Sequence, residues 1–232
     1  MKTDLSIVIP AYNEEERIGE TLQKIKDHLD KEELSFEIVV VNDGSIDKTS
    51  EEASKYSFVK VVEQPENMGK GAAVRRGMLE AQGLIRLFSD ADLSTPIYEL
   101  AKLLKSIQKG YDIALGSRAV DYSSIKKHQP FYREMMGKTF NRIVQMLVVK
   151  GIKDTQCGFK AFKEKAAEDI FKDAKIDGFG FDVEIIYLAA KKGYKIDEIS
   201  VEWYNDERSK ISPVKDSLRM FNEILKIKRL HK

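Results

Sequence analysis

The stretch LSIVIPAYNEEERIGETLQKIKDHL, residues 5–29, contains an apolar run, a polar cluster and an amphipathic segment in that order. The run over residues 5–9 is rich in β-branched residues and is typical of a buried strand. From Glu14 to Leu29 the apolar residues recur at helical spacing, which predicts a helix. The stretch therefore predicts a strand, a polar loop and a helix in succession.

The same alternation continues to about residue 117. Further strands are predicted over residues 36–42, 58–62, 84–88 and 111–118, and helices lie between them, including one over residues 70–81. Such alternation predicts an α/β fold, with a mostly parallel sheet covered by helices on both faces. The length of 232 residues fits a single domain.

Two helix starts carry recognisable capping residues. Ser45 or Asp47 is expected to cap the helix that precedes residue 58. Further along, Thr95 is expected to act as a cap, with Pro96 at the first helical position.

The composition is that of a globular protein without a strong overall charge. Thirty-nine basic and 38 acidic residues leave a net charge of +1, which gives no general attraction to nucleic acid. A single cysteine, Cys157, excludes an intramolecular disulfide and fits a reducing compartment such as the cytoplasm. We expect no membrane-crossing segment and no signal peptide, because the longest apolar runs are short.

Polar clusters follow three of the predicted strands. They are PAYNEE at residues 10–15, NDGS at residues 42–45 and DADLS at residues 90–94. Singly, Pro10 is explained as a strand stop and residues 42–44 as a tight turn. Together they fall where ligands bind in parallel sheets, outside the carboxyl ends of the strands. We interpret them as a nucleotide site, in which Asp43 accepts from a base N–H and Tyr12 or its neighbouring backbone packs on the base.

Asp90 and Asp92 directly follow an apolar strand. Carboxylates are hard oxygen ligands that suit Mg²⁺ or Mn²⁺ better than zinc. A bound divalent ion can act as a Lewis acid on a diphosphate leaving group. The alternative is a solvated turn, because aspartate is common where strands end.

The segment NMGKGAAVRRG, residues 67–77, opens a predicted helix. Lys70 lies between Gly69 and Gly71, so backbone N–H groups and an ammonium could bind phosphate there. Neither the Walker spacing nor the dinucleotide fingerprint is present. A flexible turn with a surface lysine is the alternative.

Taken together, these motifs resemble a known family. The chain is similar to the family 2 glycosyltransferases in SIVIPAYNEEERIGETL, VVNDGSIDKT, NMGKGAAVRRGM, SDADLSTP, GSR and DTQCGFKAF, which occur in this order. Within the family it resembles the dolichyl- and polyprenyl-phosphate glucosyl- and mannosyltransferases. The resemblance implies a GT-A type nucleotide-sugar-binding fold and an inverting transfer of a hexose from UDP- or GDP-hexose to a polyprenyl phosphate at the membrane surface.

The resemblance also assigns roles to individual residues. It implies nucleoside contacts for Pro10, Tyr12, Glu14 and Asp43, diphosphate contacts for Lys70, Asp90 and Ala91, and metal ligation by Asp90 and Asp92 as a D-x-D pair. Arg118 would face the donor diphosphate, and Arg133, Ser209 and Lys210 would bind the acceptor phosphate. Residues 1–117 would then bind the donor and residues 118–232 the acceptor. Arg208 departs from the pattern, because many relatives have glycine there.

Asp182 and Glu184 open a predicted helix and have two possible roles. They could be a general base and its partner, or acids that complement the helix dipole. A phosphate acceptor needs no base, because its oxygen is largely ionised at neutral pH. Asp182 is thus a catalytic candidate that we interpret as sugar-binding or structural.

Two segments mix apolar and basic residues, residues 131–150 and residues 219–232. They could lie on an anionic membrane, or pack on the core with solvated lysines. We expect peripheral association at the cytoplasmic face of the membrane.

Glucose transfer from UDP-glucose is the favoured activity, and mannose transfer from GDP-mannose to the same lipid is an alternative. Transfer to a glycan hydroxyl would require Asp182 or Glu184 as a base. A nucleotidyltransferase is disfavoured, because PAYNEE replaces the glycine- and arginine-rich signature. The Asp90 and Asp92 pair argues against an inactive, nucleotide-sugar-binding partner subunit.

Overall fold

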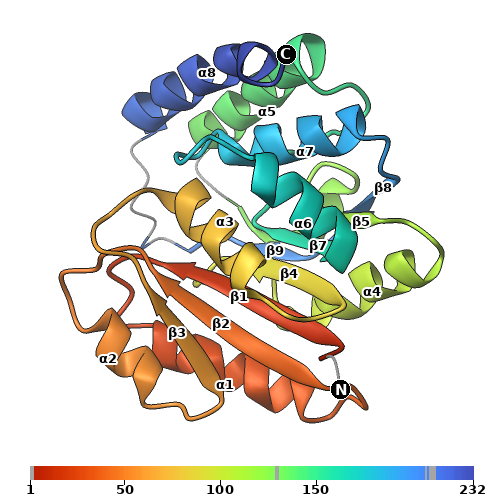
Figure 1. Ribbon diagram of the computed structural model, residues 1–232. Helices are drawn as coiled ribbons and strands as arrows, with labels where there is room; N and C mark the ends of the chain where they lie inside the picture. Colours follow the sequence, from red (N-terminus) through yellow and green to blue (C-terminus); the bar gives the residue numbers. More distant parts are fainter. Residues whose placement is uncertain (1–2, 129–130, 207, 209–212) are drawn as a thin grey trace.

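A computed structural model describes residues 3–128, 131–206, 208 and 213–232. A seven-stranded sheet with the order β3-β2-β1-β4-β7-β5-β8 forms its centre (Figure 1). The strands are β1 (Leu5–Ala11), β2 (Phe36–Asn42), β3 (Val59–Glu63), β4 (Ile85–Ser89), β5 (Ile113–Ser117), β7 (Phe159–Lys163) and β8 (Ile196–Ser200).

All pairings in this sheet are parallel except those of β7. Strand β1 pairs in parallel with β2 and β4, β2 with β3, and β5 with β8. Strand β7 lies antiparallel between β4 and β5. The predicted α/β fold with a mostly parallel sheet is confirmed. Because β7 and β8 follow residue 117, the two halves of the chain share one sheet and form a single domain.

Helices cover both faces of the sheet, as predicted (Figure 1). The helices are α1 (Ile18–Leu29), α2 (Thr49–Ser54), α3 (Lys70–Glu80), α4 (Leu100–Gln108), α5 (Phe131–Leu147), α6 (Glu164–Asp173), α7 (Phe181–Lys191) and α8 (Pro213–Leu230). Helices α1, α2 and α4 pack on one face, and α3, α6 and α7 on the other. Helices α5 and α8 form an outer layer over α7.

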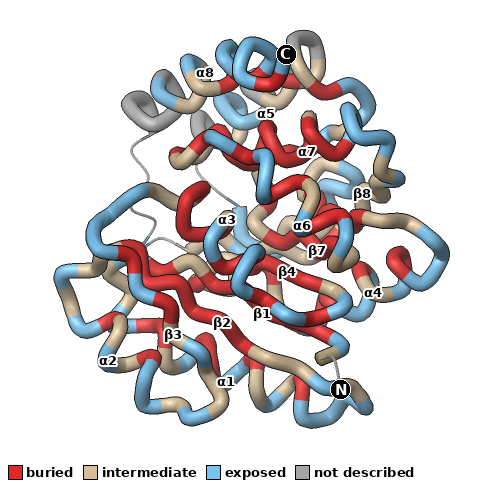
Figure 2. Tube along the Cα trace, viewed as in Figure 1, coloured by how far each residue is buried: buried red, intermediate tan, exposed pale blue. Residues whose placement is uncertain are grey.

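The alternation of side chains along each strand produces two hydrophobic cores. Along β1, Ile7 and Ile9 face α1, whereas Val8 faces the opposite core together with Phe88 of β4. All four side chains are buried, and the strands form the buried centre of the molecule in Figure 2. Successive residues of a strand therefore pack against helices on opposite faces of the sheet. This packing fixes the strand ends relative to one another.

Three predicted helix starts are wrong. The first helix begins at Ile18, because Glu14 belongs to the loop that joins it to β1. Neither Ser45 nor Asp47 is the cap residue of α2, which is Lys48, although Asp47 Oδ1 accepts a hydrogen bond from Thr49 N at 2.9 Å. Pro96 is extended and precedes a 3₁₀ turn at Ile97–Glu99, and α4 begins only at Leu100.

A short two-stranded ribbon covers part of the sheet edge. It consists of β6 (Ile125–Lys127), which follows a 3₁₀ turn at Tyr122–Ser124, and β9 (Trp203–Tyr204). The N–H of Tyr204 donates to the carbonyl of Ser94 at 2.8 Å. The ribbon is thereby tied to the loop that contains Asp90 and Asp92.

Candidate active site

The loops that follow β1 and β2 meet at the carboxyl edge of the sheet, as predicted. The N–H of Asn13 donates to Ser45 Oγ at 2.9 Å, and the N–H of Ile46 donates to Asn13 Oδ1 at 2.9 Å. The N–H of Asp43 donates to the carbonyl of Ala11 at 2.8 Å. Asn13 has a φ of 55°, a left-handed conformation that asparagine tolerates better than most residues. These bonds fix both loops beside the end of β4.

The loop after β4 is held from three directions. The N–H of Asp90 donates to the carbonyl of Gly158 at 3.1 Å, and Thr21 Oγ1 of α1 donates to the carbonyl of Ala91 at 2.6 Å. The N–H of Ser94 donates to Asp92 Oδ1 at 2.8 Å. Leu93 has a φ of 46°, which is strained for a residue with a bulky side chain. The surroundings therefore impose one conformation on this loop.

Gly158 shows how closely the β7 loop approaches Asp90. A Cβ added at Gly158 would lie 2.1 Å from Asp90 Oδ2, so a larger residue would displace the carboxylate. The glycine of the DTQCGFKAF motif thus makes room for an aspartate of the SDADLSTP motif.

Lys70 contacts Asp90 from the start of α3. Its Nζ lies 2.6 Å from Asp90 Oδ1, and the two side chains are 22% and 32% exposed. Oδ1 is buried, and no hydrogen-bond donor other than this ammonium reaches it within the described residues. Burial alone would lower the pKa of Lys70, but the charges of Asp90 and Asp182 more than offset burial and raise it. Lys70 is therefore a cation at neutral pH.

Asp90 and Asp92 have the chemistry of a site for Mg²⁺ or Mn²⁺. Both are hard oxygen donors, and Asp90 Oδ1 is buried with the Lys70 ammonium as its cationic partner. Burial raises the pKa of Asp92, and the neighbouring Asp90 charge adds to the effect. Within the described residues no third histidine, cysteine or acidic side chain completes a cluster. The pair fits an ion that keeps positions open for other oxygen ligands.

Asp43 organises the loop in front of Lys70. Its buried carboxylate accepts from Gln64 Nε2 at 2.6 Å, from Met68 N at 2.8 Å and from Gly69 N at 3.0 Å. Burial raises its pKa against the effect of these bonds. The prediction that Asp43 reads a base remains untested, but the structure gives Asp43 a second task that the sequence did not suggest.

Arg118 lies at the end of β5 and pairs with Asp154. Its Nε and Nη2 donate to the two carboxylate oxygens at 2.7 and 2.9 Å, and its guanidinium lies 5.4 Å from the ring centroid of Trp203. Burial alone would raise the pKa of Asp154, but Arg118 holds it well below its ordinary value. The pair fixes the guanidinium at the sheet edge.

Asp182 is buried behind Lys70, in the first turn of α7. Its carboxylate accepts from the ammonium of Lys160, which also donates to the carbonyl of Cys157 at 2.6 Å. Lys160 is 0% exposed and Asp182 is 4% exposed. Burial raises the pKa of Asp182. This environment fits the structural interpretation of Asp182 better than a base open to substrate.

The structure places the remaining predicted nucleoside residues on or just after β1. Pro10 lies within β1 opposite Val41, and Tyr12 is 38% exposed beside it. Glu14 accepts two hydrogen bonds from Arg17, whose Nη1 reaches Asp206 at 3.0 Å. Glu14 is thus engaged within the protein.

The predicted acceptor residues are described only in part. Arg133 lies in α5, but its side chain is outside the description, and Ser209 and Lys210 lie outside the described residues. Arg208, next to them, pairs with Asp206 at 2.7 Å. A groove of about 470 Å³ beside Asp92 is lined by Asp92, Leu93, Ser94, Lys127, Tyr204, Asn205, Asp206 and Arg208.

Two functional partners, Lys160 and Gln64, were not predicted from the sequence; they hold Asp182 and Asp43. Lys160 was detectable, because a charged residue in the apolar strand GFKAF calls for a buried partner. Gln64 gave no such signal, because a glutamine after a strand is common on protein surfaces.

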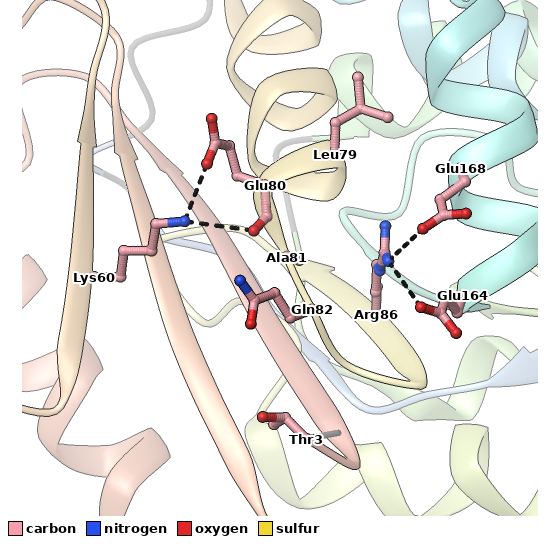
Figure 3. Close-up of a pocket in the computed structure, with 9 residues that line it drawn as sticks. All are labelled: Thr3, Lys60, Leu79, Glu80, Ala81, Gln82, Arg86, Glu164 and Glu168. Atoms are coloured by element: carbon pink, nitrogen blue, oxygen red, sulfur yellow. Dashed lines mark hydrogen bonds and ion pairs between the residues drawn. The ribbon is translucent and has the colours of Figure 1, made fainter. Parts of the chain in front are cut away.

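A different cavity, of about 810 Å³, lies at the opposite edge of the sheet (Figure 3). Among its lining residues, Arg86 pairs with Glu164 and Glu168, and Lys60 pairs with Glu80. The predicted nucleotide motifs do not contribute to it.

Comparison with solved structures identifies the class of fold. The glucosyl-3-phosphoglycerate synthase of Mycobacterium tuberculosis, solved with UDP, matches with a TM-score of 0.75 over 97% of this chain and 80% of that chain, at 18% identity. The same enzyme with Mn²⁺, UDP and glucosyl-3-phosphoglycerate matches with a TM-score of 0.74 over 97% and 78%, also at 18% identity. The fold is the GT-A fold of glycosyltransferases.

Sequence comparison identifies the family. The Glycosyl transferase family 2 profile matches residues 6–171. A dolichyl-phosphate beta-glucosyltransferase of Trichomonas vaginalis is 37% identical over 96% of this chain and 72% of its own length. The human and Saccharomyces cerevisiae dolichyl-phosphate beta-glucosyltransferases are 36% and 35% identical, each over 97% of this chain and 74% of the relative. The chain belongs to glycosyl transferase family 2.

Proposed function

We propose that this protein transfers glucose from UDP-glucose to the phosphate of a dolichol-type lipid with inversion at the sugar. The observation that carries the proposal is the Asp90 and Asp92 pair beside Lys70, at the edge of the sheet where parallel strands end. The names of the 35–37% identical relatives support glucose as the sugar and dolichyl phosphate as the acceptor.

The reaction needs one bond formed and one broken. An ionised oxygen of the lipid phosphate attacks the anomeric carbon of glucose, and the bond from that carbon to the UDP oxygen breaks. Lys70 and Arg118 are the cations that we assign to the phosphates, because both lie at the sheet edge and both are charged at neutral pH. Arg118 uses Nε and Nη2 for Asp154, which leaves Nη1 for a phosphate oxygen.

We assign Asp90 and Asp92 as ligands of Mg²⁺ or Mn²⁺. When bound, the ion would supply Lewis-acid stabilisation of the UDP leaving group. The Mycobacterium tuberculosis neighbour was solved with Mn²⁺ and UDP, which supports this class of cofactor.

Asp182 is assigned a supporting role. A buried carboxylate that is bonded to the ammonium of Lys160 is poorly placed to take a proton from a substrate hydroxyl. This disfavours a glycan hydroxyl acceptor, which requires a base, and fits a phosphate acceptor, which does not. Pro10, Tyr12, Glu14, Asp43 and Ala91 remain assigned to the donor, and Arg133, Ser209 and Lys210 to the acceptor.

We also propose that the protein works at a membrane surface, because its acceptor is a lipid. No helix in the described part of the chain is long and apolar enough to span a bilayer. In α8, Ile224 and Ile227 are buried in the core, whereas Leu225 is 54% exposed among exposed basic residues. Within residues 219–230, the part of α8 whose side chains are described, the exposed outer face is available to anionic lipid, and we place that contact at the cytoplasmic leaflet.

A transfer assay tests the proposal. Protein is incubated with radiolabelled UDP-glucose, Mn²⁺ or Mg²⁺ and dolichyl phosphate, and the label in the organic phase is counted. We expect counts that depend on the metal and are absent with GDP-mannose as donor. Asp92→Asn is assayed beside wild type. Asp112→Asn is its matched control, because Asp112 is a paired aspartate before β5, at the opposite edge of the sheet. Label in a soluble glycan instead of the lipid would overturn the lipid acceptor.

A further inference from the structure

We propose that the ammonium of Lys70 occupies the side of Asp90 where a divalent ion would bind, as long as the protein is free of metal. When the ion binds, the ammonium moves to the donor diphosphate. This inference rests on the proposed function, because it concerns how the same site changes between its free and loaded states. It predicts that Lys70 weakens metal binding in the absence of nucleotide.

The contact between Lys70 and Asp90 has the features of an exchangeable ion pair. One contact, of 2.6 Å, joins Nζ to Asp90 Oδ1, and no other hydrogen-bond donor reaches this oxygen within the described residues. The pair thus rests on a single contact, and a cation of higher charge can replace the ammonium at the same oxygen. By contrast, Arg118 binds Asp154 through two directed bonds that a metal ion could not reproduce.

When the ammonium of Lys70 moves away from Asp90, a second carboxylate remains near it. The charge of Asp182 also acts on Lys70, from the first turn of α7. Asp182 is itself held by Lys160, so its position does not depend on Lys70. The ammonium therefore has a fixed second carboxylate behind it when it moves.

Only the side chain of Lys70 needs to move. The preceding residue, Gly69, has a φ of 104°, and its N–H donates to Asp43 Oδ2 at 3.0 Å. The following N–H, of Gly71, donates to the carbonyl of Asp177 at 2.7 Å. The backbone on both sides is fixed, whereas the lysine side chain has four rotatable bonds.

The charge balance favours joint binding of the metal and the diphosphate. The carboxylates of Asp90, Asp92 and Asp182 face the ammonium groups of Lys70 and Lys160, which leaves one net negative charge. A divalent ion changes this to one net positive charge, which attracts an anionic diphosphate. Lys70 is thereby attracted to the diphosphate at the step in which it loses Asp90.

Mn²⁺ binding to the nucleotide-free protein tests the inference. The signal of free Mn²⁺ in electron paramagnetic resonance gives the dissociation constant for wild type, Lys70→Met, Lys70→Arg and Lys60→Met. We expect Lys70→Met to bind Mn²⁺ at least about tenfold more tightly than wild type, because it removes a positive charge from the ligand oxygen. Lys70→Arg keeps the charge and should stay near wild type. Lys60→Met, which removes a lysine paired with Glu80 at the opposite edge, should not change the constant.

The outcomes separate this inference from the proposed function. Equal or weaker Mn²⁺ binding by Lys70→Met overturns the inference. If circular dichroism shows that Lys70→Met is unfolded, Lys70→Gln takes its place with the same expectation. A parallel titration with UDP present tests the metal assignment itself. Wild type that binds no Mn²⁺ even with UDP contradicts the proposed metal site, whereas binding with UDP but no gain in Lys70→Met contradicts the role of Lys70 alone.

Discussion

The two edges of the central sheet, at the amino and the carboxyl ends of its parallel strands, both contain charged side chains. They differ in how completely these side chains are paired. At the edge shown in Figure 3, Arg86 is 3% exposed, donates to the carbonyls of Met78 and Gly83, and pairs with Glu168 at 3.0 Å. At the carboxyl edge, Asp90 and Asp92 lie together, Asp90 Oδ1 has one cationic partner in Lys70, and burial raises the pKa of Asp92.

This difference separates charged side chains that have complete partners within the protein from charged side chains that are suited to bind a ligand. Removing one partner of a buried pair is strongly destabilising, whereas crowded like charges cost stability and persist where function requires them. The strained φ of Leu93 lies at the same carboxyl edge. Loss of Asp92 should therefore affect activity, whereas loss of a fully paired charge such as Arg86 or Asp154 should affect stability.

The largest effect is expected for Asp92→Asn. Loss of a carboxylate ligand should lower the transfer rate by about 10³-fold, because metal stabilisation of the leaving group is worth several kcal/mol. The melting temperature should not fall, because the substitution removes a like charge beside Asp90. Initial rates of lipid glucosylation and a thermal melt measure both quantities. If the melting temperature fell far enough for unfolding to explain the lost rate, the proposed difference between the two edges would be contradicted.

Asp154→Asn should affect stability at the carboxyl edge. Breaking a buried pair costs about 3–5 kcal/mol, and we expect the lower end because Arg118 is partly exposed. Since Arg118 lowers the pKa of Asp154 in the folded state, the pair contributes stability above the unfolded pKa and loses it only as the pH falls through the folded value. Urea titrations should show a constant gap between the proteins from pH 7 to about pH 4, which closes in stronger acid. A gap that closes near pH 6 would contradict this assignment.

Arg86→Met tests the opposite edge. The substitution leaves the carbonyls of Met78 and Gly83 without their donor, so we expect a loss of about 2 kcal/mol in the free energy of unfolding. The transfer rate per folded molecule should remain that of wild type. A loss of rate without a loss of stability would show that the two edges are coupled.

Lys60→Met should have the smallest effect. Lys60 and Glu80 are each 43% exposed, and exposed ion pairs contribute about 0–1 kcal/mol. Both the unfolding free energy and the transfer rate should stay close to wild type. The variant thus sets the scale against which the other three are compared.

Much of the fold could be predicted from the sequence. The alternation of apolar strands and amphipathic helices predicts a parallel sheet with helices on both faces, because each pattern has only one way to bury its apolar residues. The antiparallel insertion of β7 between β4 and β5 could not be predicted, because strand order depends on contacts between residues that are distant in the chain.

The helix starts at residues 14, 45–47 and 95 were wrong for a related reason. Thr95 and Pro96 have the residue types of a helix start, but an extended Pro96 and a 3₁₀ turn precede α4. Local capping preferences contribute only about 1 kcal/mol, so tertiary contacts can override them.

The alternation of strands and helices is enough to predict which residues gather at the carboxyl edge, because the ends of parallel strands meet there whatever the details of packing. The role of each residue at that edge depends on contacts that the pattern does not contain. The folded chain places Lys70 against Asp90, gives Asp43 the amide groups of Met68 and Gly69 as hydrogen-bond donors, and buries Asp182 against Lys160. Burial and the nearest opposite charge set the role of a charged side chain, and both come from segments far away in the chain.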